Sequence, residues 1–191
     1  MDKVKTFRNN LGRMYRESKF EGENSATVKE HYKIIAEVNK ALFDMIPYEV
    51  VACEGEPYKN AKEMRERVVR EGVVFISTDG EPNQFMTQYE NFIGRAVHDC
   101  FAHMVCGCPF TFKGEYNAYL EQRKYYPKKV WGTLFAEIPM QTASYYYGMN
   151  FDYEQRAFEA PLELMNEAEK ILKHDYSNDS VITFLKGYRN D

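Results

Sequence analysis

The stretch Gly94-Arg95-Ala96-Val97-His98-Asp99-Cys100-Phe101-Ala102-His103 lies in the middle of the chain and places two of its four histidines five residues apart. It belongs to residues 84–105, whose apolar side chains recur at helical spacing. On a straight α-helix five residues turn through about 500°, so His98 and His103 would point about 140° apart. The two imidazoles can meet only where the helix is irregular, for example at a π-bulge, a feature that is frequent at functional sites.

The rest of the chain is predicted to be mostly helical (α+β), with a small sheet of two or three strands. Strands are expected at residues 48–53 and 73–77, which are rich in β-branched and aromatic side chains. A charged helix from Pro57 to about Arg70 would connect them as a crossover unit, the connection that parallel strands need. Further helices are expected over residues 4–18, 28–45, 114–124, 127–147 and 161–174, with breaks at Gly12 and Pro139, and a short strand or helical turn over residues 181–185.

Length and charge limit the class of protein. A chain of 191 residues predicts a single domain, because one hydrophobic core grows to roughly 250–300 residues before chains divide. The net charge of −4 gives no strong nucleic-acid footprint. No apolar run approaches the roughly 20 residues that span a bilayer, and the N-terminus is polar, so we expect a cytoplasmic chain without a membrane partner. Aromatic residues make up 15% of the chain, which suggests that some line a cavity or an interface, and an oligomer is compatible with this.

Three interpretations of the histidine pair compete. In the first, the histidines are ordinary packed or polar residues, and Asp99 pairs with Arg95 one helical turn away. The second is a structural zinc cluster formed by Cys100, His103, Cys106 and Cys108, although four ligands in one helix end depart from the usual two-knuckle spacing. In the third, both imidazoles and one distant carboxylate form the facial triad of a non-heme ferrous iron. We favour the third, because metal ligation commonly explains two clustered histidines.

Residues 73–148 resemble a domain found in phage-encoded proteins of unassigned activity. The resemblance is carried by R-A-V-H-D-x-F-x-H (residues 95–103), by F-x-x-x-G-E-x-N-A-aromatic (residues 110–119) and by Glu137 with Gln141 four residues later. That domain usually has glycine where Ala102 stands, and it lacks both Pro139 and the cysteine pair at residues 106–108. The resemblance implies a phage protein that acts in the cytoplasm of a bacterial host, with its metal-site core at about residues 73–148.

The histidine spacing also resembles that of the pterin-dependent aromatic amino acid hydroxylases. These enzymes carry His-Glu-x-x-x-His and a later iron-binding Glu that follows an aromatic-rich run. Here the corresponding segments are His98-Asp99-x-x-x-His103 and residues 131–137, which end at Glu137. The resemblance implies an iron triad of His98, His103 and Glu137. It covers only these short segments, with Asp99 in place of the family's Glu, and it implies no pterin or amino acid site.

Expectations for three carboxylates follow from their positions. Glu137 has apolar neighbours and would need a partner if buried, and Pro139 should bend its helix. Glu115 is the rival third ligand, which we assign instead as a catalytic carboxylate at a helix start. Asp99 is assigned to orient a ligand histidine or to hold Arg95. The predicted substrate pocket consists of Arg95, Tyr116, Tyr119, Gln141 and Tyr145.

The sequence therefore predicts an oxygenase-like or hydroxylase-like enzyme that uses Fe(II) on an unidentified small-molecule or nucleotide-type substrate. One alternative is a hydrolase that binds zinc or another metal through the same ligands. The other is a non-enzymatic phage protein that binds a host factor through its aromatic surface.

Overall fold

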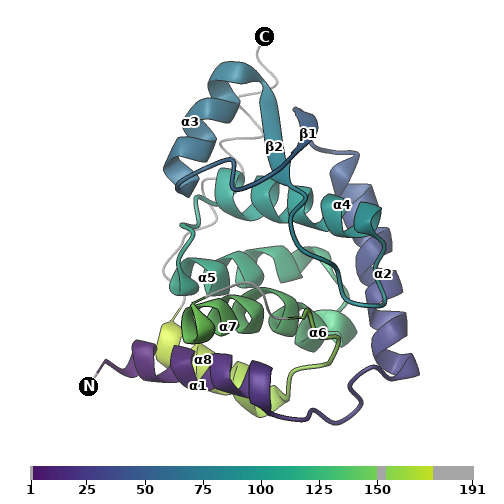
Figure 1. The fold of residues 1–191 in the computed structure, drawn as a ribbon, viewed down its shortest axis with the longest axis vertical. Coiled ribbons are helices and arrows are strands. Elements are labelled where there is room, and N and C mark those ends of the chain that lie inside the picture. Colours follow the sequence, from purple (N-terminus) through teal and green to yellow (C-terminus); the bar gives the residue numbers. More distant parts are fainter. Residues whose placement is uncertain (1, 150–153, 174–191) are drawn as a thin grey trace.

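The computed structural model describes residues 2–149 and 154–173, and it shows a mostly helical chain with a small sheet (Figure 1). The predicted fold class is therefore confirmed. The helices are α1 (Lys3–Glu17), α2 (Ala26–Phe43), α3 (Ala61–Glu71), α4 (Gln88–His98), α5 (Phe112–Gln122), α6 (Trp131–Phe135), α7 (Gln141–Gly148) and α8 (Leu162–Leu172). Within the described residues no helix is long and apolar enough to cross a membrane. The element expected at residues 181–185 lies outside the described residues.

Two π-helical turns interrupt the regular helices. The first, η1 (Asp99–Val105), continues α4 directly, and the second, η4 (Ala136–Met140), joins α6 to α7 and contains Pro139. Short 3-10 turns, η2 (Arg123–Tyr125) and η3 (Lys128–Val130), link α5 to α6. Both π-turns fall where the sequence required an irregular helix, since His98 borders η1 and a proline cannot supply the regular hydrogen bond in η4.

The crossover unit has the predicted form. Strands β1 (Glu49–Cys53) and β2 (Val73–Ser77) pair in parallel with Glu49 opposite Val73, and α3 connects them. Val74 and Ile76 alternate along β2 and are fully buried against α3 and α4, as expected for a sheet with one face on the core. The described residues form two strands and give no third.

Gly12 does not break α1, contrary to the prediction. The helix runs through it, because the glycine serves close packing rather than a bend. A Cβ at this position would lie 2.2 Å from the carbonyl oxygen of Ala143 in α7. The close contact between α1 and α7 therefore depends on a residue without a side chain at position 12.

The helices stack in layers below the crossover unit. In Figure 1, α4 lies beneath the sheet, α5 lies below α4, and α6, α7, α1 and α8 form the opposite end, while α2 runs along one side. The segment of α4 and η1 is packed into two cores at once. Ile93 and Val97 belong to the larger core, and Ala96, Cys100 and Met104 belong to the smaller core beneath the sheet. This double packing holds the central histidines in a rigid part of the fold.

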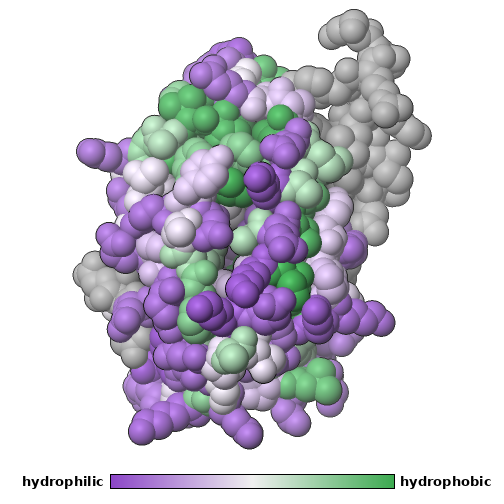
Figure 2. Space-filling model, turned by 90° about the vertical axis from the view of Figure 1, so that its right-hand side faces the viewer, coloured by the Kyte–Doolittle hydropathy of each residue, from purple (hydrophilic) through white to green (hydrophobic). Residues whose placement is uncertain are grey.

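The face that carries α2 is mainly hydrophilic. Figure 2 shows hydrophobic residues gathering on this face toward the end that carries the sheet.

Candidate metal centre

The π-turn η1 brings the two central histidines together. In a π-helix each backbone hydrogen bond joins residues five apart, so a side chain five positions on returns to the same side of the helix. His98 and His103 meet in this way, with their Nε2 atoms 3.0 Å apart and their rings at 84° to each other. The prediction that an irregular backbone would unite the pair is confirmed.

Glu115 supplies a carboxylate to the same point from the first turn of α5. Its Oε2 lies 3.1 Å from His98 Nε2, and its Oε1 lies 3.4 Å from His103 Nε2. The Thr111 side chain caps this helix by accepting a hydrogen bond from the Gly114 amide. Within residues 2–149 and 154–173, His98, His103 and Glu115 are the one group of three metal-ligating side chains whose ligand atoms lie within 4.8 Å of one another.

Gly114 allows α5 to start where Glu115 can reach the histidines. A Cβ on Gly114 would lie 1.8 Å from the carbonyl oxygen of Pro109, in the segment that connects η1 to α5. The chain therefore turns back on itself at a distance that only glycine permits. The close approach of Gly114 to Pro109 places the next residue, Glu115, within reach of the two histidines.

The outer nitrogen of each imidazole binds a carbonyl oxygen. His98 Nδ1 donates to Gln122 Oε1 at 2.9 Å, and His103 Nδ1 donates to the Cys108 backbone carbonyl at 2.8 Å. Because a carbonyl oxygen only accepts hydrogen bonds, both Nδ1 atoms carry hydrogen in this assignment. Each ring can then direct the lone pair of Nε2 at the common point, as in metal-binding histidines.

The charges of the site are unequal. Burial lowers the pKa of His103 to about 4, so this imidazole is neutral at pH 7. Burial also acts to lower the pKa of His98, but the hydrogen bond and charge of Glu115 outweigh it and raise that pKa to about 9. Burial raises the pKa of Glu115, but the two imidazoles more than offset this effect and hold it below its usual value. At pH 7 the metal-free site therefore combines a neutral imidazole, a proton on His98 and a carboxylate.

Access to the site is one-sided. The His103 side chain is 2% exposed, whereas those of His98 and Glu115 are 20% and 13% exposed. Phe110 packs its ring edgewise against His103, with centroids 4.5 Å apart. A molecule from solvent must therefore approach the common point from the side of His98 and Glu115.

Glu137, the predicted third ligand, is not in the cluster. It lies in η4 and accepts hydrogen bonds from the hydroxyl of Tyr32, in α2, and from Asn83 Nδ2 at 3.2 Å. Burial raises the pKa of its carboxyl to about 7, against the lowering effect of both hydrogen bonds. The expectation that a buried Glu137 would need a partner is confirmed, but its partners are a tyrosine and an asparagine and not the histidines. The structure therefore replaces Glu137 with Glu115 as the carboxylate of the site.

Asp99 and Arg95 lie beside the cluster without joining it. Burial raises the pKa of Asp99 to about 7, while the charges of His98 and Arg95 act in the opposite direction. Arg95 Nη1 donates to the Ser77 carbonyl at the end of β2, at 2.9 Å. No hydrogen bond joins Asp99 to a ligand imidazole among the described residues, because Gln122 and Cys108 occupy both outer nitrogens.

The predicted pocket residues are dispersed. Tyr116 and Tyr119 are 2% and 1% exposed and pack edgewise against Phe135 in the larger core. Gln141 and Tyr145 lie half-buried on α7, where Tyr145 packs on Tyr146. Tyr116 and Tyr119 therefore belong to the larger core and do not line a pocket at the histidines.

The cysteines do not form a metal cluster with His103 in the described residues. The ring of His103 binds the backbone carbonyl of Cys108, and the Cys106 thiol donates to the Phe101 carbonyl. Burial raises the pKa of Cys106 and of Cys108 to about 12, and among the described residues neither thiol belongs to a group of three metal-ligating side chains. The zinc-cluster interpretation has no geometric support.

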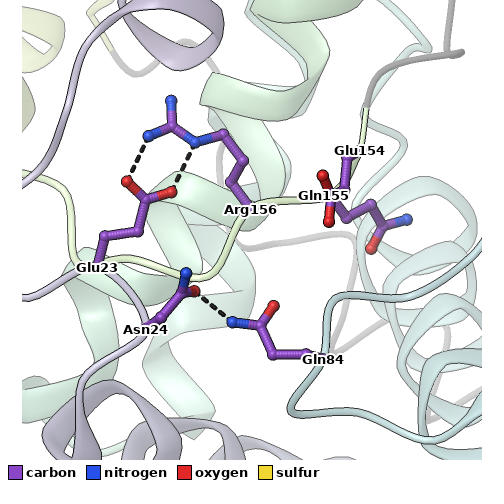
Figure 3. A pocket seen from close by; sticks show the side chains of 6 residues that line it. All are labelled: Glu23, Asn24, Gln84, Glu154, Gln155 and Arg156. Carbon is purple, nitrogen blue, oxygen red and sulfur yellow. Dashed lines mark hydrogen bonds and ion pairs between the residues drawn. The ribbon is translucent and has the colours of Figure 1, made fainter.

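A polar cleft of about 270 Å³ lies elsewhere on the molecule (Figure 3). Glu23 and Arg156 form an ion pair on one side of it, and Asn24 and Gln84 bond across another. It contains none of the residues predicted for the substrate pocket.

No protein-family model, no curated protein and no solved structure matches this chain. The chemistry of the site is therefore inferred from its own geometry.

Sequence reasoning missed the importance of Gln122. A signal for it exists, since Gln122 follows Glu115 by seven residues, or two helical turns, and so lies on the same face of α5. No sequence signal marks the carbonyl of Cys108, because any residue offers that group.

Proposed function

We propose that this chain is a metalloenzyme that holds one divalent transition-metal ion through His98 Nε2, His103 Nε2 and the carboxylate of Glu115. The observation that carries the proposal is the convergence of these three groups, with both imidazoles oriented by carbonyl acceptors. Three protein ligands leave coordination positions free for water or substrate, which distinguishes a reactive centre from a structural one.

The finer proposal is a ferrous centre with oxygenase-type chemistry. Two imidazoles and one carboxylate are the donor set of non-heme Fe(II) oxygenases. When bound, ferrous iron would activate O₂ for insertion of one oxygen atom into the substrate. A cosubstrate would have to donate the two electrons that reduce the second oxygen atom to water. The protein's own part is to bind the ion, to keep His103 dry behind Phe110 and to admit substrate beside His98 and Glu115. The resemblance to a phage-encoded domain supports, on sequence alone, an origin in a phage.

A zinc-dependent hydrolase is the second candidate, because the same donor set binds zinc in hydrolytic enzymes. The observation that favours it is the partial exposure of His98 and Glu115, which leaves the common point open to a water molecule that the metal would activate.

Metal analysis of anaerobically purified protein tests the proposal. We expect about one metal ion per chain in the wild type and little metal in Glu115→Gln. The loss of a direct ligand should lower metal affinity by more than the ten- to hundredfold that is typical of losing an outer partner. Glu137→Gln is the matched control, since it changes a buried carboxylate outside the cluster and should keep its metal. Equal metal content in all three proteins would contradict the proposal.

The identity of the ion separates the two chemistries. A ferrous centre with a free position should bind nitric oxide and give the paramagnetic signal of an iron–nitrosyl complex. Retention of zinc together with hydrolysis of activated esters would favour the hydrolase instead.

A further inference from the structure

A buried chain of hydrogen bonds leads away from the candidate metal centre. His98 Nδ1 donates to Gln122 Oε1, Gln122 Nε2 donates to the hydroxyl of Tyr126 at 3.2 Å, and that hydroxyl donates to Asn39 Oδ1 in α2. Gln122, Tyr126 and Asn39 are 4%, 4% and 3% exposed. Beyond His98, the chain therefore joins α5, the segment that follows it and α2 through buried side chains.

The direction of this chain sets the state of His98. The Asn39 oxygen only accepts, so the Tyr126 hydroxyl uses its hydrogen there and accepts from Gln122. Gln122 must then present its amide nitrogen to Tyr126, which leaves its oxygen for His98. A carbonyl oxygen at this position requires hydrogen on His98 Nδ1, and Nε2 becomes the nitrogen available to a metal.

The two histidines differ in how this orientation is secured. His103 relies on the backbone carbonyl of Cys108, which no substitution removes, whereas His98 relies on one side chain that must itself be held in place. Among the residues described, Gln122 is the side chain that bonds the outer nitrogen of a ligand imidazole.

We propose that Gln122 is a positioning residue of the metal centre, which fixes His98 with its Nε2 lone pair toward the ion and is itself oriented by Tyr126 and Asn39. The inference rests on the proposed metal binding. Outer partners of this kind raise the basicity of the ligand and hold its ring, and their removal typically lowers metal affinity by ten- to hundredfold.

Two substitutions of Gln122 separate positioning from support of the fold. Gln122→Met keeps the length of the side chain but removes the acceptor. Gln122→Glu keeps an acceptor and makes it stronger. A positioning role predicts that Gln122→Met lowers Co(II) affinity by about ten- to hundredfold while Gln122→Glu binds at least as tightly as the wild type. A purely structural role predicts the reverse order, because a buried glutamate disturbs a core more than a methionine.

Co(II) titration of the full chain, followed by visible absorption, measures these affinities. Proton NMR of the Co(II) form adds a specific signature, since each ligand ring should give a shifted, exchangeable Nδ1–H signal. The signal of His98 should broaden or vanish in Gln122→Met and that of His103 should persist. Tyr126→Phe, which leaves Gln122 in place but unheld, should lose less affinity than Gln122→Met.

The outcomes are distinct. A wild type that binds no Co(II) would refute the metal site itself. A wild type that binds Co(II), with Gln122→Met within twofold of it, would overturn the role of Gln122 alone. Equal losses in Gln122→Met and Gln122→Glu, matched by lower melting temperatures of both metal-free proteins, would also overturn it.

Discussion

Replacement of Gly114 by alanine should damage the fold and the metal centre together. A Cβ at this position lies 1.8 Å from the Pro109 carbonyl oxygen, and an ordinary contact begins near 3.4 Å, so the first turn of α5 must move by about 1.6 Å. Glu115 is the next residue, and metal–ligand distances tolerate only about 0.2 Å of variation. Alanine favours a helix over glycine by about 1 kcal/mol, but overpacking costs typically 1–3 kcal/mol and more against backbone.

We therefore expect Gly114→Ala to lower the free energy of unfolding by up to about 2 kcal/mol, the overpacking cost less the helix gain, and to weaken Co(II) binding by more than about tenfold. Urea unfolding of the metal-free protein and Co(II) titration measure the two effects. Gly12→Ala is the matched control, because its Cβ would lie 2.2 Å from the Ala143 carbonyl in a helix contact that contains none of the three ligands. It should lose stability and keep its affinity. Unchanged Co(II) binding by Gly114→Ala, or an equal loss in Gly12→Ala, would refute the reasoning.

Three further predictions concern protons and thiols. Metal binding at pH 7 should release about one proton, because His98 has a pKa of about 9 in the metal-free site and must be neutral to bind the ion. Calorimetry in buffers of different ionisation enthalpy measures the number of protons released, and a value near zero would contradict the prediction. The titration of Glu137 should make stability fall as pH rises from about 4.5 to about 7, since the folded state holds this proton more tightly than the unfolded state, while His103, with its pKa lowered to about 4, acts in the opposite direction. The difference in pH-dependent unfolding between the wild type and Glu137→Gln isolates the Glu137 effect, and equal slopes in the two proteins would argue against a buried carboxyl. Cys106→Ser and Cys108→Ala should bind metal as the wild type does, because neither thiol belongs to the group of His98, His103 and Glu115, and position 108 contributes only its backbone carbonyl. Loss of metal in either variant would support the cysteine cluster instead.

The features that the sequence predicted well depend on neighbouring residues. Strand β2 was expected at Val73–Ser77 and has those bounds, because a β-branched run followed by turn residues acts locally. The irregular helix between His98 and His103 also followed from spacing alone, since a regular helix cannot bring residues five apart to one point.

The third ligand required knowledge of packing that the sequence does not contain. Glu137 lies in the π-turn η4, and Glu115 lies in the first turn of α5. The role of each carboxylate depends on which helix lies opposite it. Tyr32, 105 residues away from Glu137, holds that carboxylate against α2, while the close turn at Gly114 brings Glu115 to the histidines. Contacts between distant segments decide such roles, and local patterns do not report them.

The aromatic content was expected to line a cavity or an interface in part. The structure buries several tyrosines completely, including Tyr15, Tyr32, Tyr116 and Tyr119, and leaves Tyr89, Tyr125 and Tyr147 exposed. The buried hydroxyls of Tyr32 and Tyr126 bond to Glu137 and Asn39, which explains how a core can hold so many polar rings.

The most direct test of the central claim is a crystal structure of the metal-loaded protein with anomalous scattering measured at the absorption edge of the bound metal. The account predicts a single strong anomalous peak about 2.0–2.2 Å from His98 Nε2, His103 Nε2 and a Glu115 oxygen, with Gln122 and the Cys108 carbonyl still bonded to the outer nitrogens. A peak on the cysteines or on Glu137, or no peak in this cluster, would contradict it.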